Sequence, residues 1–324
     1  MNGSKRYVLP PLAAVLAGAL VLPAYAAPES AGSADALVTM PIAENQECMT
    51  YRGVRMQGNL RATDPDGGAL TYEIVERPKK GTVALDEENS AVFVYTPAEG
   101  KTGRDSFTFC VRDEDGNVSA PATVKMEILK GKTDVRYADM EDDPAHAAAV
   151  RLAEEGVYTG RKMGVSYFFD PETPVTRGEF LAMTMTAAGI DSRVDVIVTG
   201  FGDDESIPTW AKGYASAAQD RGVVTGKPSG GEVFFSADEP ITYSEAATIL
   251  NRVMAITDVD AAAFSDSGVP AWAVQSVANL SSVDVLPGGA DYGAKLNRAA
   301  AAQMLCAAMD LMDTRQGGPL GWLK

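Results

Sequence analysis

Pro174-Val-Thr-Arg-Gly-Glu179 is the first of three related copies in this chain of 324 residues. The stretch returns as Pro240-Ile-Thr-Tyr-Ser-Glu245 and, in altered form, as Lys295-Leu-Asn-Arg-Ala-Ala300. After each copy, apolar residues recur with helical spacing over Phe180–Ile190, Ala246–Ile256 and Ala301–Met312. The recurrence predicts three related helices, each of which begins at the repeated hexapeptide.

Two copies carry the residues of a helix capping box. Thr176 stands three residues before Glu179, and Thr242 stands three residues before Glu245. In this motif the threonine hydroxyl accepts a hydrogen bond from the N3 amide, and the glutamate accepts one from the cap amide. The third copy keeps a residue that can cap a helix, Asn297, but has no glutamate.

An arginine follows the cap in two of the three copies, at Arg177 and Arg298. The first turn is the positive end of the helix dipole, so a fixed positive charge there is unfavourable unless an anion lies close by. Free amides at a helix start, together with a guanidinium group, suit a carboxylate or a phosphate. One interpretation is therefore an anion-binding site. The alternative is an arginine that is exposed or paired with a neighbouring acidic side chain.

The copies belong to a longer repeat with a period of about 64 residues. An aromatic-x-Asp motif opens each unit, and a proline then precedes an aromatic position by two residues. A short helix, a glycine loop and the capped helix follow, and the loop of the third unit is shorter than the other two. The recurring residues are Asp139, Asp203 and Asp266, then His146, Trp210 and Trp272, and then Gly160 and Gly226 in the first two units.

From about Leu37 to Leu129 the pattern changes to short runs that turn residues separate. The spacing predicts about seven strands in roughly ninety residues, which is the size of an Ig-like sandwich. The candidate strands are Val54–Ala62, Leu70–Val75, Thr82–Leu85, Ala91–Tyr95, Ser106–Arg112 and Thr123–Leu129.

Two families resemble these regions. The first region resembles the bacterial cadherin-like, Ig-like repeats of large surface proteins. The motifs that carry this resemblance are Asp64-Pro-Asp-Gly67, Tyr95-Thr-Pro97 and Gly103-Arg-Asp-Ser-Phe107. The order of motifs from Tyr137 to Met312 resembles three S-layer homology units. The resemblances imply a multidomain chain, in which an all-β Ig-like sandwich precedes a mainly α-helical, pseudo-threefold S-layer homology triplet. In such a triplet the capped helices meet at the centre, and grooves lie between adjacent units.

The second resemblance implies non-covalent anchoring to an anionic secondary cell-wall polysaccharide, typically one whose end sugar carries a pyruvate ketal. The implied carbohydrate-binding residues are Arg177, Arg298, Trp210, Trp272, Gly160, Gly226, Asp139, Asp203 and Asp266. The arginines would hold the carboxylate, the tryptophans would cover a sugar face, and the glycines would permit close approach. The alternatives are core packing for the tryptophans, turn or capping roles for the aspartates, and a left-handed backbone for the glycines.

Several positions depart from the family pattern. Tyr243 replaces the arginine in the second unit, and His146 replaces the tryptophan in the first. The third unit lacks the glutamate and part of its loop. We therefore expect one or two working grooves rather than three.

The predicted sandwich has two further features that bear on its chemistry. The loops with Asp64 and Asp66, and with Asp113 and Asp115, should fall at the same end, where four carboxylates could bind Ca²⁺; the alternative is a pair of Asp-Gly turns. Export permits a disulfide, and Cys48 with Cys110 is the candidate pair. Cys306 falls in the last apolar helix, where we expect a buried thiol.

The chain ends complete the predicted domain map. Residues 1–26 read as a signal peptide, with Lys5 and Arg6, an apolar run and an Ala24-Tyr25-Ala26 cleavage site. The predicted regions are 27–36 as a disordered leader, 37–129 as the sandwich, 130–136 as a linker, 137–199, 200–262 and 263–313 as the units, and 314–324 as a tail. We expect no transmembrane segment in the mature chain, which would be secreted to the cell wall or S-layer.

Composition argues against two classes of function, nucleic-acid binding and histidine-ligated metal binding. A formal net charge of −16 argues against nucleic acid as a partner, and a single histidine argues against a His-ligated metal site. The leading hypothesis is a wall-anchored surface protein and not an enzyme, with the sandwich as a spacer or as a module that contacts other surface proteins. The alternatives are a Ca²⁺-dependent adhesion protein and a wall-anchored hydrolase; in the leading reading no cofactor is required.

Overall fold

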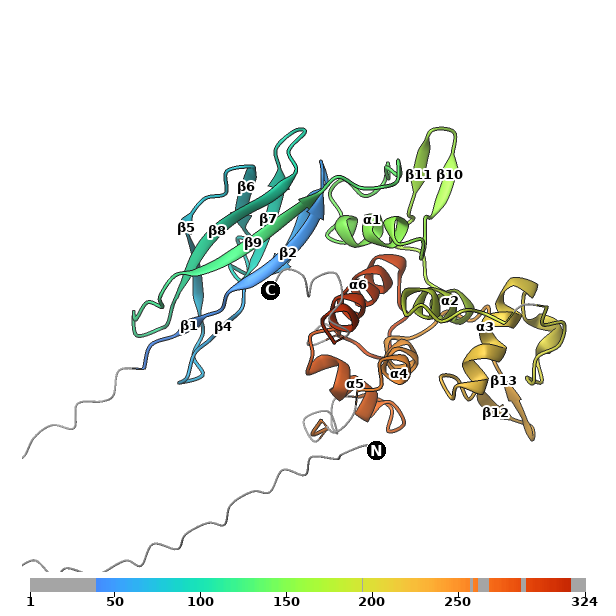
Figure 1. Cartoon of the computed structure of the whole chain (residues 1–324). Coiled ribbons are helices and arrows are strands. Elements are labelled where there is room, and N and C mark those ends of the chain that lie inside the picture. The colour runs from blue at the N-terminus through green and yellow to red at the C-terminus, as the bar shows by residue number, and fades with distance from the viewer. Residues whose placement is uncertain (1–38, 194, 257–258, 262–267, 287–289, 316–324) are drawn as a thin grey trace, which may run out of the picture. The chain divides into compact units, whose positions relative to one another are not determined.

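The N-terminal region is β-rich, as predicted (Figure 1). The computed structural model describes residues 39–315 apart from 194, 257–258, 262–267 and 287–289, so the predicted signal peptide and leader lie outside the described residues. One sheet has the strand order β2-β9-β8-β5, a second has the order β3-β7-β6, and β1 pairs with β4. The strands are β1 Ile42–Ala43, β2 Gln46–Tyr51, β3 Met56–Asn59, β4 Ala62–Thr63, β5 Thr71–Glu76, β6 Gly81–Leu85, β7 Val92–Pro97, β8 Gly103–Arg112 and β9 Ala122–Leu129.

Alternation along these strands directs one face of each sheet into a shared core. Along β9, buried residues alternate with less buried ones, which is the pattern of a strand with one covered face. Both sheets contribute to the core, whose largest buried side chains are Phe93, Tyr95, Phe107, Phe109, Met126 and Ile128. The aspartate of the Gly103-Arg-Asp-Ser-Phe107 motif has a structural role there. Asp105 accepts hydrogen bonds from the Tyr95 hydroxyl at 2.7 Å and from the backbone amides of Lys79 and Lys80.

The cysteine pairing predicted for this region is not formed. Cys48 lies on β2, a strand that the sequence pattern did not reveal, and Cys110 lies on β8. Strand β9 lies between them, so their backbones are separated by two strand spacings, about 9 Å or more. A disulfide requires Cα atoms within about 7 Å. Both cysteines are free thiols in the structure.

The aspartate loops lie at the same end of the sandwich, since Thr71 of β5 pairs with Arg112 of β8. Asp64 accepts hydrogen bonds from the amides of Asp66 and Gly68 at 3.0 and 2.8 Å. Asp113 accepts two from Asn117, both at 2.8 Å. Within the described residues, no group of three or more His, Cys, Asp or Glu side chains is placed to hold a metal ion. These observations favour the turn role, and the Ca²⁺ site that includes Asp115 stays a prediction.

The C-terminal region combines helices with two short β-hairpins, which the sequence pattern did not predict. The elements of the first two predicted units are α1 His146–Glu154, β10 Arg161–Met163, β11 Ser166–Phe168, α2 Arg177–Ala187, the 3₁₀ turn Asp204–Ser206, α3 Thr209–Asp220, β12 Lys227–Ser229, β13 Glu232–Phe234 and α4 Tyr243–Met254. The third unit has α5 Val274–Ser281 and α6 Arg298–Arg315, which continues beyond the predicted end at residue 313. In the described part of the chain, no helix is both long and apolar enough to traverse a bilayer.

All three predicted caps are present. Thr176 with Glu179 and Thr242 with Glu245 form complete capping boxes at the starts of α2 and α4. Asn297 caps α6 by accepting the amide of Ala300 at 2.9 Å. The helices therefore begin where the repeated hexapeptide predicts, because capping is decided by residues within one turn of the helix start.

A closed ring of backbone hydrogen bonds joins the segments just before these caps. The amide of Val175 donates to the carbonyl of Leu296, that of Leu296 to Ile241, and that of Ile241 to Val175, each at 2.9 Å. All three side chains are buried, with no more than 1% of their surface exposed. Equivalent residues of the three units thus hold one another in a cyclic order.

Helix packing follows the same cyclic order. Helix α2 packs against α3, α4 against α5, and α6 against α1 (Figure 1). The last of these pairs joins the first and third units through Arg151, which is buried on α1 and forms ion pairs with Asp310 and Asp313 of α6. The thiol of Cys306 is also buried on α6, as predicted, and its pKa is raised by that burial.

Candidate functional site

The starts of α2, α4 and α6 each lie against the next unit in the ring, and we call these three contacts junctions. The first junction joins the start of α2 to the second unit, the second joins the start of α4 to the third unit, and the third joins the start of α6 to the first unit. The predicted carbohydrate-binding residues are distributed over these junctions.

Arg177 is buried in the first junction, with 9% of its side chain exposed. Its Nη1 lies 3.9 Å from Glu245 Oε1, and its guanidinium carbon lies 5.7 Å from the centre of the Phe235 ring. Its Nε is buried without a hydrogen-bond partner in the described structure. Burial lowers the pKa of Arg177, but an arginine remains charged at neutral pH. Arg177 is therefore a buried cation whose hydrogen-bonding capacity is only partly used.

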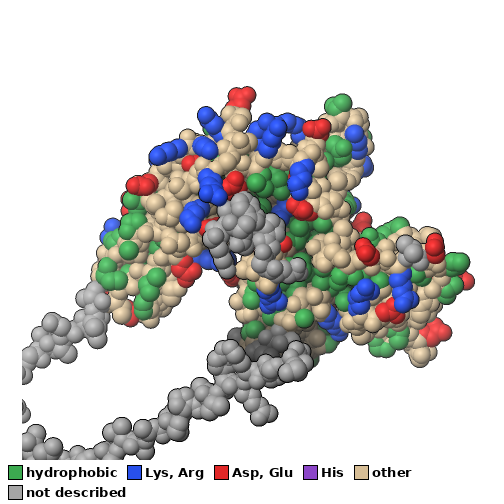
Figure 2. Space-filling model, in the orientation of Figure 1, with side chains coloured by type: hydrophobic (Ala, Val, Ile, Leu, Met, Phe, Trp, Pro, Cys, Tyr) green, Lys and Arg blue, Asp and Glu red, His purple; other side chains and the backbone are tan. Residues whose placement is uncertain are grey.

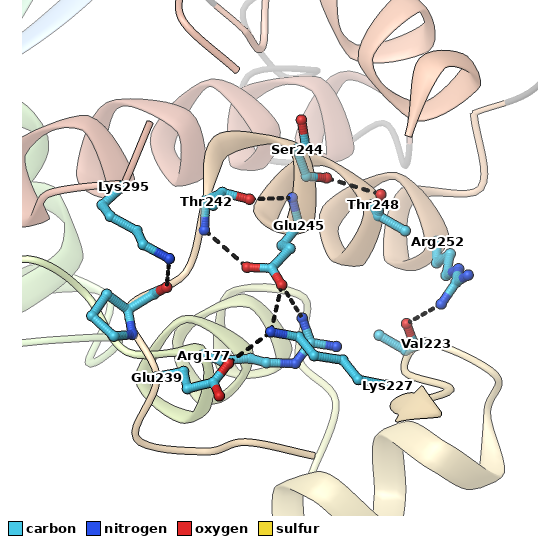
Figure 3. Close-up of polar contacts among 11 residues, drawn as sticks. Arg177, Val223, Lys227, Glu239, Thr242, Ser244, Glu245, Thr248, Arg252 and Lys295 are labelled. Carbon is cyan, nitrogen blue, oxygen red and sulfur yellow. Dashed lines mark hydrogen bonds and ion pairs between the residues drawn. The ribbon is translucent and has the colours of Figure 1, made fainter. Parts of the chain in front are cut away.

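Lys227 lies beside Arg177, at the start of β12 (Figure 3). Its Nζ is 2.8 Å from both Glu239 Oε2 and Glu245 Oε1. Burial alone would lower the pKa of Lys227, but the hydrogen bonds to the two glutamates outweigh this effect and raise it. Burial alone would raise the pKa of Glu245, but hydrogen bonds from Lys227 and from the Thr242 amide lower it. The first junction thus has two cations, and two carboxylates balance them.

Trp210 stands beside this cluster, on the first turn of α3. A Cβ atom at Gly178 of α2 would lie 3.5 Å from Cη2 of the Trp210 ring, so the ring covers the start of α2. Half of Trp210 remains exposed, at 51%. An aromatic face that is both anchored and open to solvent is the form suited to contact a sugar ring. The structure therefore places Trp210 against Gly178, the residue that follows Arg177, and core packing does not account for this tryptophan.

The third junction repeats the arrangement with other residues. Arg298 lies 3.5 Å from Asp170 and 4.0 Å from Glu179, and its guanidinium carbon is 5.6 Å from the centre of the Tyr158 ring. Arg161, at the start of β10, forms a second ion pair with Asp170 at 3.2 Å. His146 begins α1 in the place that Trp210 has in the second unit, and burial lowers its pKa.

The second junction lacks these charges. Tyr243 occupies the position of the arginine on α4, and Ala300 occupies the position of the glutamate on α6. Trp272 is 59% exposed just before α5, so it is not a core residue, and no described contact links it to Tyr243. The second unit lacks the arginine and the third unit lacks the glutamate, and both missing residues therefore belong to the same junction.

The expectation of free amides at the helix starts was wrong. In α2 the amides of Arg177 and Gly178 donate to carbonyls of Glu239 and Ala237, which belong to the next unit. The first two amides of α4 and of α6 are taken in the same way. The third amide of each helix is taken by its cap residue. Any anion at these junctions must therefore be held by side chains.

The aspartates of the aromatic-x-Asp motif hold the loop backbone. Asp139 accepts the amides of Phe169 and Asp170, and Asp203 accepts those of Phe235 and Ser236. Asp170 and Ser236 have positive φ angles of 55° and 58°, so the aspartates stabilise a strained turn after each hairpin. This is the turn role that the sequence left open, and Asp266 lies outside the described residues.

The loop glycines have a steric role. Gly160 has φ of 67°, and a Cβ there would lie 2.3 Å from the Phe168 carbonyl oxygen. Gly226 has φ of 75°, and a Cβ there would lie 2.3 Å from Val233 Cγ1. Both residues close the base of a hairpin, and the left-handed alternative for them is correct.

Arg161 and Lys227 are the candidate residues that the sequence reasoning missed. Each directly follows a loop glycine, Gly160 or Gly226, so a basic residue recurs at the same place in two units. That recurrence was a usable signal. Its meaning depended on the hairpins, which bring the start of each loop back to the arginine of the preceding unit.

An open hollow of about 320 Å³ adjoins the first junction. It shares Ala237 and Glu239 with the junction, and its lining includes the carboxylates of Asp203 and Asp238. With three acidic side chains and no basic one in its lining, this hollow does not suit an anion.

Comparison with known proteins agrees with both resemblances in part. The family model described as a bacterial Ig domain matches residues 38–127, and the model of the S-layer homology domain matches residues 200–247. The second match covers the second unit, from the 3₁₀ turn into α4. The surface-layer 125 kDa protein of Lysinibacillus sphaericus is 27% identical over 134 residues, which cover 41% of this chain and 11% of that protein.

Solved structures add only weak likenesses. The endo-fucoidan hydrolase MfFcnA4 of glycoside hydrolase family 107 is 21% identical over 31% of this chain and 15% of its own, with a TM-score of 0.25. A point mutant of the SrpA adhesin from Streptococcus sanguinis is 18% identical over 39% and 82%, also with a TM-score of 0.25. Neither score supports an argument. The sequence matches indicate a cell-surface, S-layer-associated protein that carries a bacterial Ig domain and an S-layer homology domain.

Proposed function

We propose that the C-terminal region is a triplet of S-layer homology units that anchors the exported chain non-covalently to an anionic, pyruvylated secondary cell-wall polysaccharide. The closed ring through Val175, Ile241 and Leu296 supports three equivalent units, including the two that lie outside the matched residues 200–247. In this proposal the sandwich is a spacer or an interaction module, and the function is anchoring rather than catalysis.

The single observation that carries the proposal is the environment of Arg177. A cation with 9% of its side chain exposed, whose only ion pair is as long as 3.9 Å among the described residues, can turn toward a carboxylate without losing a strong internal contact. Lys227 lies beside it and can turn one of its three donors toward the same group. Trp210 supplies the adjacent apolar face for the sugar that bears the carboxylate.

Two working sites follow from this proposal. The first junction has Arg177, Lys227 and Trp210, and the third has Arg298 and Arg161 without a tryptophan. The second junction has Tyr243 in place of the arginine, so it would not bind the anion. Because the region has 26 acidic and 11 basic side chains over residues 137–313, binding depends on local contacts and not on long-range attraction.

The test is binding of the full chain to purified cell walls, before and after mild acid removal of ketal groups. Arg177→Ala and Lys227→Ala should each weaken binding to untreated walls at least tenfold, because each removes a direct donor to the carboxylate. Tyr243→Ala is the matched control, since it occupies the same helix position at the second junction, and it should bind like the parent. If Arg177→Ala and Tyr243→Ala bind equally well, the assigned role of Arg177 is wrong.

A further inference from the structure

The sandwich is strongly polarised in charge between its two ends. The loops β5–β6 and β7–β8, with the strand ends beside them, form one end, and Figure 2 shows Lys and Arg side chains gathered over it. We call this surface the basic end. Its basic residues are Arg77, Lys79, Lys80, Lys101, Arg104 and Lys130, and the exposed Glu76 and Glu99 lie on the same surface. The loops of the opposite end carry Asp64, Asp66, Asp86, Glu87, Asp113 and Glu114.

The basic end is built as one surface. Lys80 Nζ donates to the carbonyl of Thr102 at 2.8 Å, and a Cβ at Gly103 would lie 3.3 Å from the same nitrogen. The amides of Lys79 and Lys80 donate to Asp105 of β8, which ties the two loops together. This backbone scaffold fixes the spacing of cations that come from separate loops.

Most of these cations are available to a partner. Arg77, Lys79 and Lys101 are exposed, and none of the three forms an ion pair within the residues that the structure describes. Arg104 is 74% exposed at its side chain and pairs with Glu127 only at 3.6 Å. Unpaired like charges on one small surface repel one another, and an anionic partner relieves that repulsion.

The basic end is also the end from which the chain continues into the anchoring region. Gly103 of β8 pairs with Ile128, so the end of β9 and Lys130 lie beside the β7–β8 loop. The short segment from Lys130 to Arg136 then leads to the first unit. A second binding surface joined by a short linker raises the effective concentration of the same polymer at the first.

We propose that the basic end is a second binding surface for the anionic wall polymer. It binds the negative charges along the polymer and does not recognise the terminal sugar. This inference rests on the proposed anchoring function. The C-terminal region offers such a polymer few cations, whereas the basic end gathers basic side chains on one surface, where they attract an anion locally. Contact with a polyanion releases condensed counterions, so binding through this surface weakens steeply with salt.

The experiment compares four full-length proteins on purified walls over a range of salt concentrations. They are the parent, the variant Arg77→Ala/Lys79→Ala/Lys101→Ala, the charge-matched control Arg112→Ala/Lys125→Ala/Arg221→Ala, and Arg177→Ala/Arg298→Ala. The first triple variant should lose about tenfold in affinity at low salt and reduce the slope of log K against log salt by about 2. The control should keep the slope of the parent.

Each contrary result has a separate meaning. If the two triple variants bind walls alike, the basic end has no such role, while loss of binding in Arg177→Ala/Arg298→Ala would leave the anchoring proposal intact. Full binding by Arg177→Ala/Arg298→Ala would instead contradict the anchoring proposal. Sedimentation of the proteins without walls tests whether a second copy of this chain, and not the wall polymer, binds the basic end. Self-association that only the first triple variant loses, with wall binding unchanged, would assign the basic end to a second copy and overturn the inference.

Discussion

Nη1 of Arg177 lies 3.9 Å from Oε1 of Glu245, the glutamate that completes the capping box of the next unit. One carboxylate therefore serves its own helix and also holds the arginine of a neighbour. Arg298 and Glu179 repeat the relationship at 4.0 Å. At the second junction Tyr243 stands in place of the arginine and Ala300 in place of the glutamate. Where the arginine is missing, a glutamate would have no arginine of a neighbouring unit to pair with.

Glu245→Gln tests this double role of the glutamate. Glutamine keeps an oxygen for the Thr242 amide but loses the charge that pairs with Lys227 and Arg177. We expect a loss of about 2 kcal/mol in the free energy of unfolding at pH 7, measured from the helical circular dichroism signal in urea. Glu179→Gln is the matched control and should cost less, since its nearest cation, Arg298, is 4.0 Å away.

The effect of Glu245→Gln depends on pH in a defined direction. The pKa of Glu245 is lowered in the folded chain, so its charge stabilises the fold above the ordinary glutamate value of about 4.3. This contribution is lost as the pH falls through the lower, folded value. The difference between parent and variant should therefore shrink as the pH is reduced below about 4. A difference that is constant from pH 7 to pH 3 would contradict the ionic role.

Tyr243→Arg with Ala300→Glu should rebuild the missing ion pair at the second junction. Each change alone adds an uncompensated charge, so each should be neutral or slightly destabilising. Together they should show a favourable coupling energy of about 0.5 kcal/mol or more in a double-mutant cycle of urea unfolding. Simple additivity of the two single changes would mean that positions 243 and 300 do not face each other as positions 177 and 245 do.

Arg151 tests the closure between the first and last units. Arg151→Ala removes a buried side chain that pairs with Asp310 and Asp313, and we expect a loss of about 3 kcal/mol in the free energy of unfolding. Arg151→Met keeps most of the apolar stem and should cost less. Chemical unfolding of the helices measures both. An unchanged midpoint for Arg151→Ala would show that this ion pair does not hold α1 to α6.

Gly160→Ala and Gly164→Ala separate steric clash from backbone strain. Both residues have positive φ, at 67° and 62°, but a Cβ at Gly164 would meet no atom within 4 Å. Gly164→Ala should therefore cost about 1 kcal/mol, from the left-handed backbone alone. Gly160→Ala should cost clearly more, because its Cβ would lie 2.3 Å from the Phe168 carbonyl. Equal costs, measured by thermal unfolding, would argue against the close approach.

Local signals predicted much of this protein correctly. The starts of α2, α4 and α6, the three caps and most strands of the sandwich follow from residues within one turn or one strand of each other. Strand β2 was missed because Gln46–Tyr51 mixes polar and apolar residues without clear alternation. The hairpins β10–β11 and β12–β13 were missed because strands of three residues are too short to show a period.

The sequence alone determined the repeat, the helix starts and the presence of two unlike regions, because periodicity and capping act over a few neighbouring residues. Only the tertiary structure decided which residues meet at a junction, since Arg177 and Glu245 come from different units and are brought together by the ring through Val175, Ile241 and Leu296. Other backbone contacts between neighbouring units occupy the helix amides that the sequence left free. Contacts between units that are far apart in the sequence thus decided that Arg177 is buried with its Nε donor unpartnered.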